Sequence, residues 1–131
     1  MTDKEITQTA TNELLSLPAE LREAEILVAN LQVDLRQAKS DMAAAEMEAQ
    51  VNAQVDGKNA EARKLQMEQA VRLSPAVTAA RERLALLEAQ LATAEVDQAA
   101  LARRFRAALV LAELQSARIM YLTTFKIKNY A

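Results

Sequence analysis

The fold is decided by residues 14–52, whose sequence is LLSLPAELREAEILVANLQVDLRQAKSDMAAAEMEAQVN. Apolar residues recur here at intervals that alternate between three and four, and only the last position of the series is polar: Leu14, Leu17, Leu21, Ala24, Val28, Leu31, Leu35, Ala38, Met42, Ala45, Ala49 and Asn52. Because this is the seven-residue repeat of a coiled coil, it predicts a long helix with one stripe packed against another helix.

A second stripe with the same spacing lies nearer the C-terminus: Val77, Ala80, Leu84, Leu87, Leu91, Ala94, Gln98, Leu101, Phe105, Ala108, Ala112, Gln115, Ile119 and Leu122. We therefore predict two helical arms, the first over residues 18–55 and the second over residues 75–122. The tail, residues 123–131, loses the repeat, and its pattern does not distinguish an extended end from a final turn.

A short polar connector that contains the only glycine, Gly57, joins the two arms. A lone glycine just past a long helix most often adopts a left-handed backbone conformation, so we expect the chain to reverse there. Asn59 is a suitable N-cap for a connector helix over residues 60–72. Ser74 and Pro75 repeat the start signal for the second arm.

The N-terminal residues predict a short helix over residues 2–16, because Thr2 and Glu5 fit a capping box. Pro18 either begins the first arm, where its missing N–H costs nothing, or kinks one continuous helix. The proline disfavours helical backbone angles at Leu17, so a helix boundary near Leu17 is the favoured interpretation.

The distribution of charge favours an antiparallel arrangement of the arms. Residues 1–56 carry 11 acidic and 4 basic side chains, whereas residues 98–131 carry one acid and six bases. An antiparallel hairpin places the basic end of the chain beside its acidic beginning. The sequence therefore predicts an all-α fold, in which residues 1–131 form one domain: an antiparallel two-helix coiled-coil hairpin with short N-terminal and connector helices.

Apolar residues outside the two stripes widen the face that each arm has to bury, and Ile26, Val33 and Leu109 are among them. We therefore predict a homodimer in which two hairpins assemble into a four-helix bundle. The alternative is that residues 2–16 and the connector helix fold back over the exposed face of a single chain.

The composition excludes several classes of protein. One glycine and two prolines in 131 residues are too few for the turns of an all-β fold. Without histidine or cysteine, the sequence lacks the usual zinc ligands and any thiol, and we predict a non-enzymatic protein with no cofactor, metal or small-molecule substrate. The sequence has neither a transmembrane run nor a signal peptide, so we expect a cytoplasmic protein that does not bind membranes.

Two groups of residues are candidates for contact with a partner. The first group lies at the connector tip, since polar hairpin tips are common binding points: Lys58, Asn59, Arg63 and Lys64. The second group makes the C-terminal third basic: Arg103, Arg104, Arg106, Arg118, Lys126 and Lys128. Pairing of this second group with the acidic first arm is the favoured interpretation, and contact with nucleic acid, aided by stacking of Phe125, Tyr121 or Tyr130 on bases, is the alternative.

The order of these parts resembles a group of small coiled-coil proteins, mostly of unassigned function, that are encoded by bacteriophages and prophages. The specific part of the resemblance is residues 57–66, Gly-Lys-Asn-Ala-Glu-Ala-Arg-Lys-Leu-Gln, followed by a turn at Ser74 and Pro75, where the group often has an acidic residue before the proline. The resemblance implies a phage accessory protein that acts in the bacterial cytoplasm.

Three hypotheses for the function follow. The first is a protein that binds a protein partner, either phage recombination machinery or a host nuclease or defence complex. The second is a single-stranded DNA-binding accessory of recombination, and the third is a structural phage component.

Overall fold

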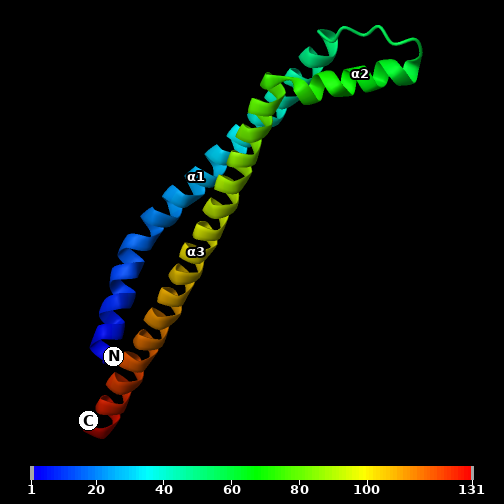
Figure 1. Ribbon diagram of the computed structural model, residues 1–131. Helices are drawn as coiled ribbons and strands as arrows, with labels where there is room; N and C mark the ends of the chain where they lie inside the picture. The colour runs from blue at the N-terminus through cyan, green and yellow to red at the C-terminus, as the bar shows by residue number, and fades with distance from the viewer. Residues whose placement is uncertain (1, 131) are drawn as a thin grey trace. The chain divides into compact units, whose positions relative to one another are not determined.

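The structure is a computed structural model that describes residues 2–130, and these residues form three helices and no strand (Figure 1). The helices are α1 (Asp3–Val51), α2 (Ala60–Leu73) and α3 (Pro75–Tyr130). The prediction of an all-α fold is therefore confirmed.

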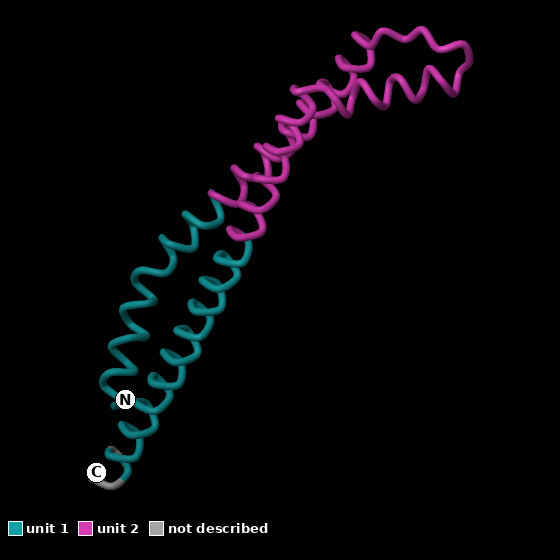
Figure 2. The backbone as a smooth tube through the Cα atoms, in the orientation of Figure 1, with its two compact units in different colours: residues 1–26, 95–131 teal, residues 27–94 magenta. Residues whose placement is uncertain are grey.

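The chain divides into two compact units, each built from parts of the long helices (Figure 2). Unit 1 contains Met1–Ile26 and Glu95–Ala131, so it combines the beginning of α1 with the end of α3. Unit 2 is Leu27–Ala94 and contains the rest of α1, all of α2 and the beginning of α3. Whether the chain behaves as one domain stays a prediction.

Helix α1 begins with the predicted capping box and then runs without interruption through Pro18. The Thr2 N–H donates to Glu5 Oε2 at 2.7 Å, and the Glu5 N–H donates to Thr2 Oγ1 at 3.2 Å. The favoured boundary near Leu17 is wrong, and the structure shows the other alternative, one continuous helix. Pro18 donates no N–H to the helix, but continuing the helix keeps Ala10 and Leu17 in one buried stripe, with exposed fractions of 2% and 0%.

In unit 1 the two helices run antiparallel. Arg104 Nη2 donates to Glu13 Oε1 at 3.1 Å, and Arg118 donates to the Asp3 carboxylate. The partner in α3 moves back from Arg118 to Arg104 as the position in α1 advances from Asp3 to Glu13. The two helices therefore run in opposite directions. Ala10, Leu17 and Ala108 form the buried core of this unit.

The two predicted stripes coincide with the less exposed faces of the helices. In the first stripe, every position except Asn52 is buried or half-buried, and the second stripe is covered from Val77 to Gln115. Its last two positions, Ile119 and Leu122, are 60% and 45% exposed. They are exposed because α1 begins at Asp3, which pairs with Arg118. Within the described residues, no turn of α1 lies beside the part of α3 that follows Arg118.

The helix ends differ in part from those predicted. Helix α1 ends at Val51 rather than at residue 55, and α2 ends one residue past the predicted range of 60–72. Ser74 joins α2 to α3 by donating its N–H to the Val71 carbonyl at 3.3 Å and accepting the Val77 N–H on its hydroxyl at 3.4 Å. The second arm does not end at Leu122, because α3 continues to Tyr130.

The tail of the chain is therefore helical as far as the structure describes it, and Ala131 lies outside the described residues. The hydroxyls of Thr123 and Thr124 donate to the carbonyls four residues earlier, at 2.8 and 2.9 Å. The end of the apolar repeat marks the end of the covered stripe and not the end of the helix.

Candidate partner-binding tip

The connector folds against α2 through one side chain, that of Gln66. Its Oε1 accepts the N–H groups of Asp56 at 3.1 Å and Gly57 at 2.9 Å, and its Nε2 donates to Asp56 Oδ1 at 2.5 Å. A single amide thus satisfies two backbone donors and one carboxylate, so the loop after α1 is held in one conformation beside α2. Sequence reasoning did not identify Gln66 as a structural residue.

Gly57 is required for a different reason from the one predicted. The expected left-handed conformation is wrong, because Gly57 does not have a positive φ. A Cβ atom at this position would lie 2.9 Å from Ala62 Cβ and 2.9 Å from the Arg63 backbone nitrogen. The residue is therefore the point at which the loop backbone passes directly over the first turn of α2, where any side chain would collide.

Two of the four predicted tip residues make contacts within the tip. Asn59 is the N-cap of α2, as predicted, and its Oδ1 accepts the Ala62 N–H at 2.8 Å. Arg63 Nη1 donates to the Gly57 carbonyl at 3.4 Å, a long hydrogen bond. Lys58 and Lys64 are exposed, and within the described residues their side chains form no hydrogen bond or ion pair. Of the four, these two lysines are available for a partner.

The tip also exposes apolar side chains that the sequence analysis did not single out. Helix α2 has no buried residue, and its Leu65 and Leu73 are 61% and 70% exposed. Glu61 and Glu68 lie four residues before and three residues after Leu65, on the same face of the helix. An apolar side chain within a charged rim is the usual composition of a protein-binding surface.

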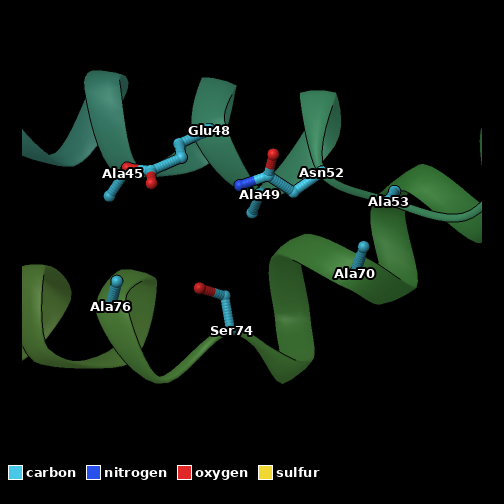
Figure 3. Close-up of a pocket in the computed structure, with 8 residues that line it drawn as sticks. All are labelled: Ala45, Glu48, Ala49, Asn52, Ala53, Ala70, Ser74 and Ala76. Carbon is cyan, nitrogen blue, oxygen red and sulfur yellow. The ribbon is translucent and has the colours of Figure 1, made fainter.

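A hollow of about 320 Å³ lies in unit 2 where the end of α1 faces the junction of α2 and α3 (Figure 3). Alanines line most of it, from α1 and the residues after it on one side and from α2 and α3 on the other: Ala45, Ala49, Ala53, Ala70 and Ala76. Glu48, Asn52 and Ser74 supply its polar groups. Small side chains leave this space open, and two of them, Ala45 and Ala49, belong to the first stripe.

The basic C-terminal third is partly paired within unit 1. Arg104 and Arg118 pair with acidic residues of α1, as the favoured interpretation predicts for this group. The other four cations are exposed and, within residues 2–130, make no ion pair: Arg103, Arg106, Lys126 and Lys128. The rings of Tyr121 and Phe125, which are 70% and 54% exposed, stack with centroids 6.5 Å apart.

Other kinds of site were also sought. Among the described residues, no three acidic side chains are grouped so that they could hold a metal ion. Within the same residues, none of the helices has the length of apolar sequence that a bilayer-spanning segment needs. Comparison of the chain with protein-family models, with curated proteins and with solved structures gave no match.

Proposed function

We propose that this protein is a non-enzymatic accessory protein that binds another protein through the tip of an antiparallel coiled-coil hairpin. The observation that carries the proposal is the combination at the tip of a fixed loop and an exposed apolar side chain. The Gln66 hydrogen bonds hold the loop, while Leu65, the residue before Gln66 in α2, stays exposed. A surface that is already ordered loses little conformational entropy on binding, which favours affinity.

The proposed setting is a phage or prophage protein in the bacterial cytoplasm, with recombination machinery or a host nuclease or defence complex as the partner. Support comes from the resemblance over residues 57–66. That segment begins with Gly57 and ends with Gln66, the two residues joined by the 2.9 Å hydrogen bond that shapes the tip. The resemblance therefore concerns the residues that determine the surface proposed to bind.

The proposed quaternary structure is a homodimer in which two hairpins form a four-helix bundle. Many apolar side chains outside the two stripes are exposed in a single chain, including Ile26 at 50%, Val33 at 54% and Val110 at 53%. Burial of such side chains between two copies would stabilise the assembly. In the alternative, residues 2–16 and the connector helix fold back over this face of a single chain. Residues 3–16 instead continue α1.

A direct test uses two surface substitutions with nearly equal starting exposure. Leu65→Glu at the tip should abolish co-purification of the partner from infected or lysogenic cells, because it places a charge in the centre of the apolar surface. Leu86→Glu in α3, where the leucine is 59% exposed against 61% for Leu65, is the matched control and should retain the partner. Equal retention by both variants would disprove binding at the tip.

Single-stranded DNA binding is the second candidate. It is favoured by four exposed cations that form no ion pair within the described part of the chain, and by the exposed, stacked rings of Tyr121 and Phe125. Fluorescence anisotropy of a labelled oligonucleotide at about 50 mM salt tests it, since phosphate contacts are strongest at low salt. DNA affinity that falls when Arg103 and Arg106 are changed to alanine supports this function, and an unchanged anisotropy of the oligonucleotide excludes it.

A structural phage component is the third candidate. Co-purification of phage structural proteins alone with the wild-type chain would favour it over the other two.

A further inference from the structure

The apolar stripe of α3 continues beyond the part that α1 covers. Ala108, in the covered part, is 0% exposed, whereas Ile119 and Leu122, farther along the same stripe, are 60% and 45% exposed. Helix α1 begins at Asp3, which pairs with Arg118. Within the described residues, the stripe therefore changes from covered to uncovered at the level of this ion pair.

Three residues form the uncovered continuation of the stripe, which we call the open track: Ile119, Leu122 and Lys126. At 100° per residue, they lie within about 60° of one another around α3, and Ala108 lies in the same sector. Met120, which is also exposed, lies about 160° around the helix from Leu122 and is not part of the track. The track is thus a direct extension of the face that packs against α1.

Helix α1 shows which kind of helix this face of α3 accepts. Its stripe residue Leu17 is 0% exposed, so the contact has an apolar centre. Carboxylates of α1 also pair with cations of α3, as Glu13 does with Arg104 at 3.1 Å and Asp3 with Arg118. The established interface therefore combines an apolar stripe with acidic side chains on the α1 side.

The open track lies in a part of the sequence whose charges are all positive. Glu113 is the last acidic residue, and three cations follow it: Arg118, Lys126 and Lys128. Lys126 belongs to the track itself, so a helix that covers the track encloses the lysine ammonium group. Because enclosing an unpaired charge is unfavourable, the covering helix needs a carboxylate at that position.

We propose that the open track binds an acidic amphipathic helix of a partner protein, which continues along α3 the line of packing that α1 begins. Apolar side chains of the partner cover Ile119 and Leu122, and a carboxylate pairs with Lys126. The contact does not involve the tip in unit 2, so it adds a second protein-binding site to the one under the proposed function.

Two other occupants fit the track less well. A second copy of this segment also has only cations after Glu113, so pairing of two such segments brings like charges together. Nucleic acid is bound by several cations on one face, whereas Lys128 lies about 160° around α3 from Lys126. The apolar stripe with one cation in it favours an acidic helix over both.

The first experiment titrates the full-length protein into a fluorescently labelled synthetic peptide of about four heptads, a length at which an isolated helix is stable enough to bind. Its apolar residues alternate at intervals of three and four, and glutamates flank them. The control peptide has lysine in place of every glutamate. At about 0.15 M salt the anisotropy should rise with the acidic peptide and not with the basic one. Equal binding of the two peptides, or binding of neither, would overturn the proposal.

Paired variants test whether the peptide lies on the track. Leu122→Glu should weaken binding of the acidic peptide at least roughly tenfold, whereas Met120→Glu, on another side of α3, should change it by less than about threefold. Lys126→Glu should also weaken binding roughly tenfold, and Lys128→Glu, which makes the same change of charge off the track, should have an effect below about threefold. Circular dichroism should show unchanged helix content in all four variants, since the four side chains are exposed.

Hydrogen exchange locates the peptide independently of any substitution. Residues 119–130 extend α3 by about three turns, and an uncovered helix of that length is marginal in water. The acidic peptide should therefore slow amide exchange in residues 119–126 and leave residues 60–73 of α2 unchanged. Unchanged exchange in residues 119–126 would contradict binding at the track.

The alternatives give different results. Equal losses in Lys126→Glu and Lys128→Glu would show attraction without a defined face and would overturn the proposal. So would a wild-type mass of two chains by light scattering that Leu122→Glu, but not Met120→Glu, reduces to one, because a second copy then covers the track. Leu65→Glu should bind the acidic peptide as the wild type does, which separates failure of this inference from failure of the proposed function.

Discussion

At the scale of single residues, Gln66 determines the shape of the tip. Its amide accepts from two backbone N–H groups and donates to Asp56, and no other side chain joins the loop to α2 so extensively within the described residues. The short distance from Gly57 to Ala62 depends on the same placement of the loop. Removal of the amide should therefore release the loop without melting the helices.

Gln66→Ala should raise the amide hydrogen-exchange rates of Asp56 and Gly57 by roughly five- to tenfold, because a typical intramolecular hydrogen bond contributes about 1 kcal/mol. Exchange measured by NMR checks this. Gln69→Ala is the matched control, since the Gln69 side chain is exposed and forms no hydrogen bond within residues 2–130. Equal rates in the Gln66→Ala variant and the wild type would show that the loop is held by other contacts.

At the scale of the element, α1 keeps one helix through Pro18 because its apolar stripe is continuous. The proline removes one backbone hydrogen bond, and its ring crowds the carbonyl four residues earlier. Burial of Leu17 and Ala10 on one face of the helix offsets that cost. We therefore expect that replacing Pro18 with a helix-forming residue stabilises α1.

Pro18→Ala should increase the free energy of unfolding by about 1–3 kcal/mol, since proline costs about 3 kcal/mol relative to alanine inside a helix and α1 has partly adapted to it. Urea denaturation measures the change. The control is Glu20→Ala, an exposed position two residues later, which should shift stability by less than about 0.5 kcal/mol. A destabilised Pro18→Ala variant would show that the native helix geometry depends on the proline.

The stripe itself can be tested with two leucines that are two residues apart. Leu17 is fully buried, whereas Leu15 is 78% exposed. Leu17→Ala should lower the free energy of unfolding by about 2–5 kcal/mol, because it leaves a cavity between packed helices. Leu15→Ala should change it by less than about 0.5 kcal/mol. Similar losses in the two variants would mean that the stripe is not the surface that stabilises α1.

At the scale of the whole molecule, the distribution of charge agrees with the antiparallel pairing in unit 1, but we expect it to contribute little to stability. Residues 1–56 and 98–131 carry opposite net charges. Nevertheless, unit 1 joins them by two described ion pairs with mostly exposed side chains, Glu13 with Arg104 and Asp3 with Arg118. Exposed pairs are worth about 0–1 kcal/mol each and are screened by salt.

Raising the salt from about 0.05 M to about 1 M, where the Debye length falls to about 3 Å, should therefore lower the free energy of unfolding in urea by less than about 2 kcal/mol. Urea is suitable because it is uncharged. The double variant Glu13→Gln with Arg104→Gln is the control, and its salt dependence should be smaller still. A much larger loss of stability at high salt would contradict a core held together by apolar burial.

Most of the fold could be predicted from the pattern of residues, and the errors arose where contacts between elements outweighed a local signal. Thr2 with Glu5 and Asn59 act as caps, as their positions predicted, because a cap depends only on residues within one turn. Pro18 was misread because local preference favoured a boundary, whereas burial of the stripe favoured a continuous helix. Gly57 was identified as essential for the wrong reason, since its contact partner, Ala62, belongs to the next helix.

The sequence by itself determined that the chain is helical, which face of each helix is covered, and where the connector helix begins. These properties depend on spacing along the chain and on contacts within a turn. Only the tertiary structure decided that Gln66 fixes the loop, that Arg104 has an ion pair while Arg103 and Arg106 form none within residues 2–130, and that α3 continues past its stripe with apolar side chains exposed. Those properties depend on which residues come together across elements, and a periodic pattern permits many pairings until folding selects one.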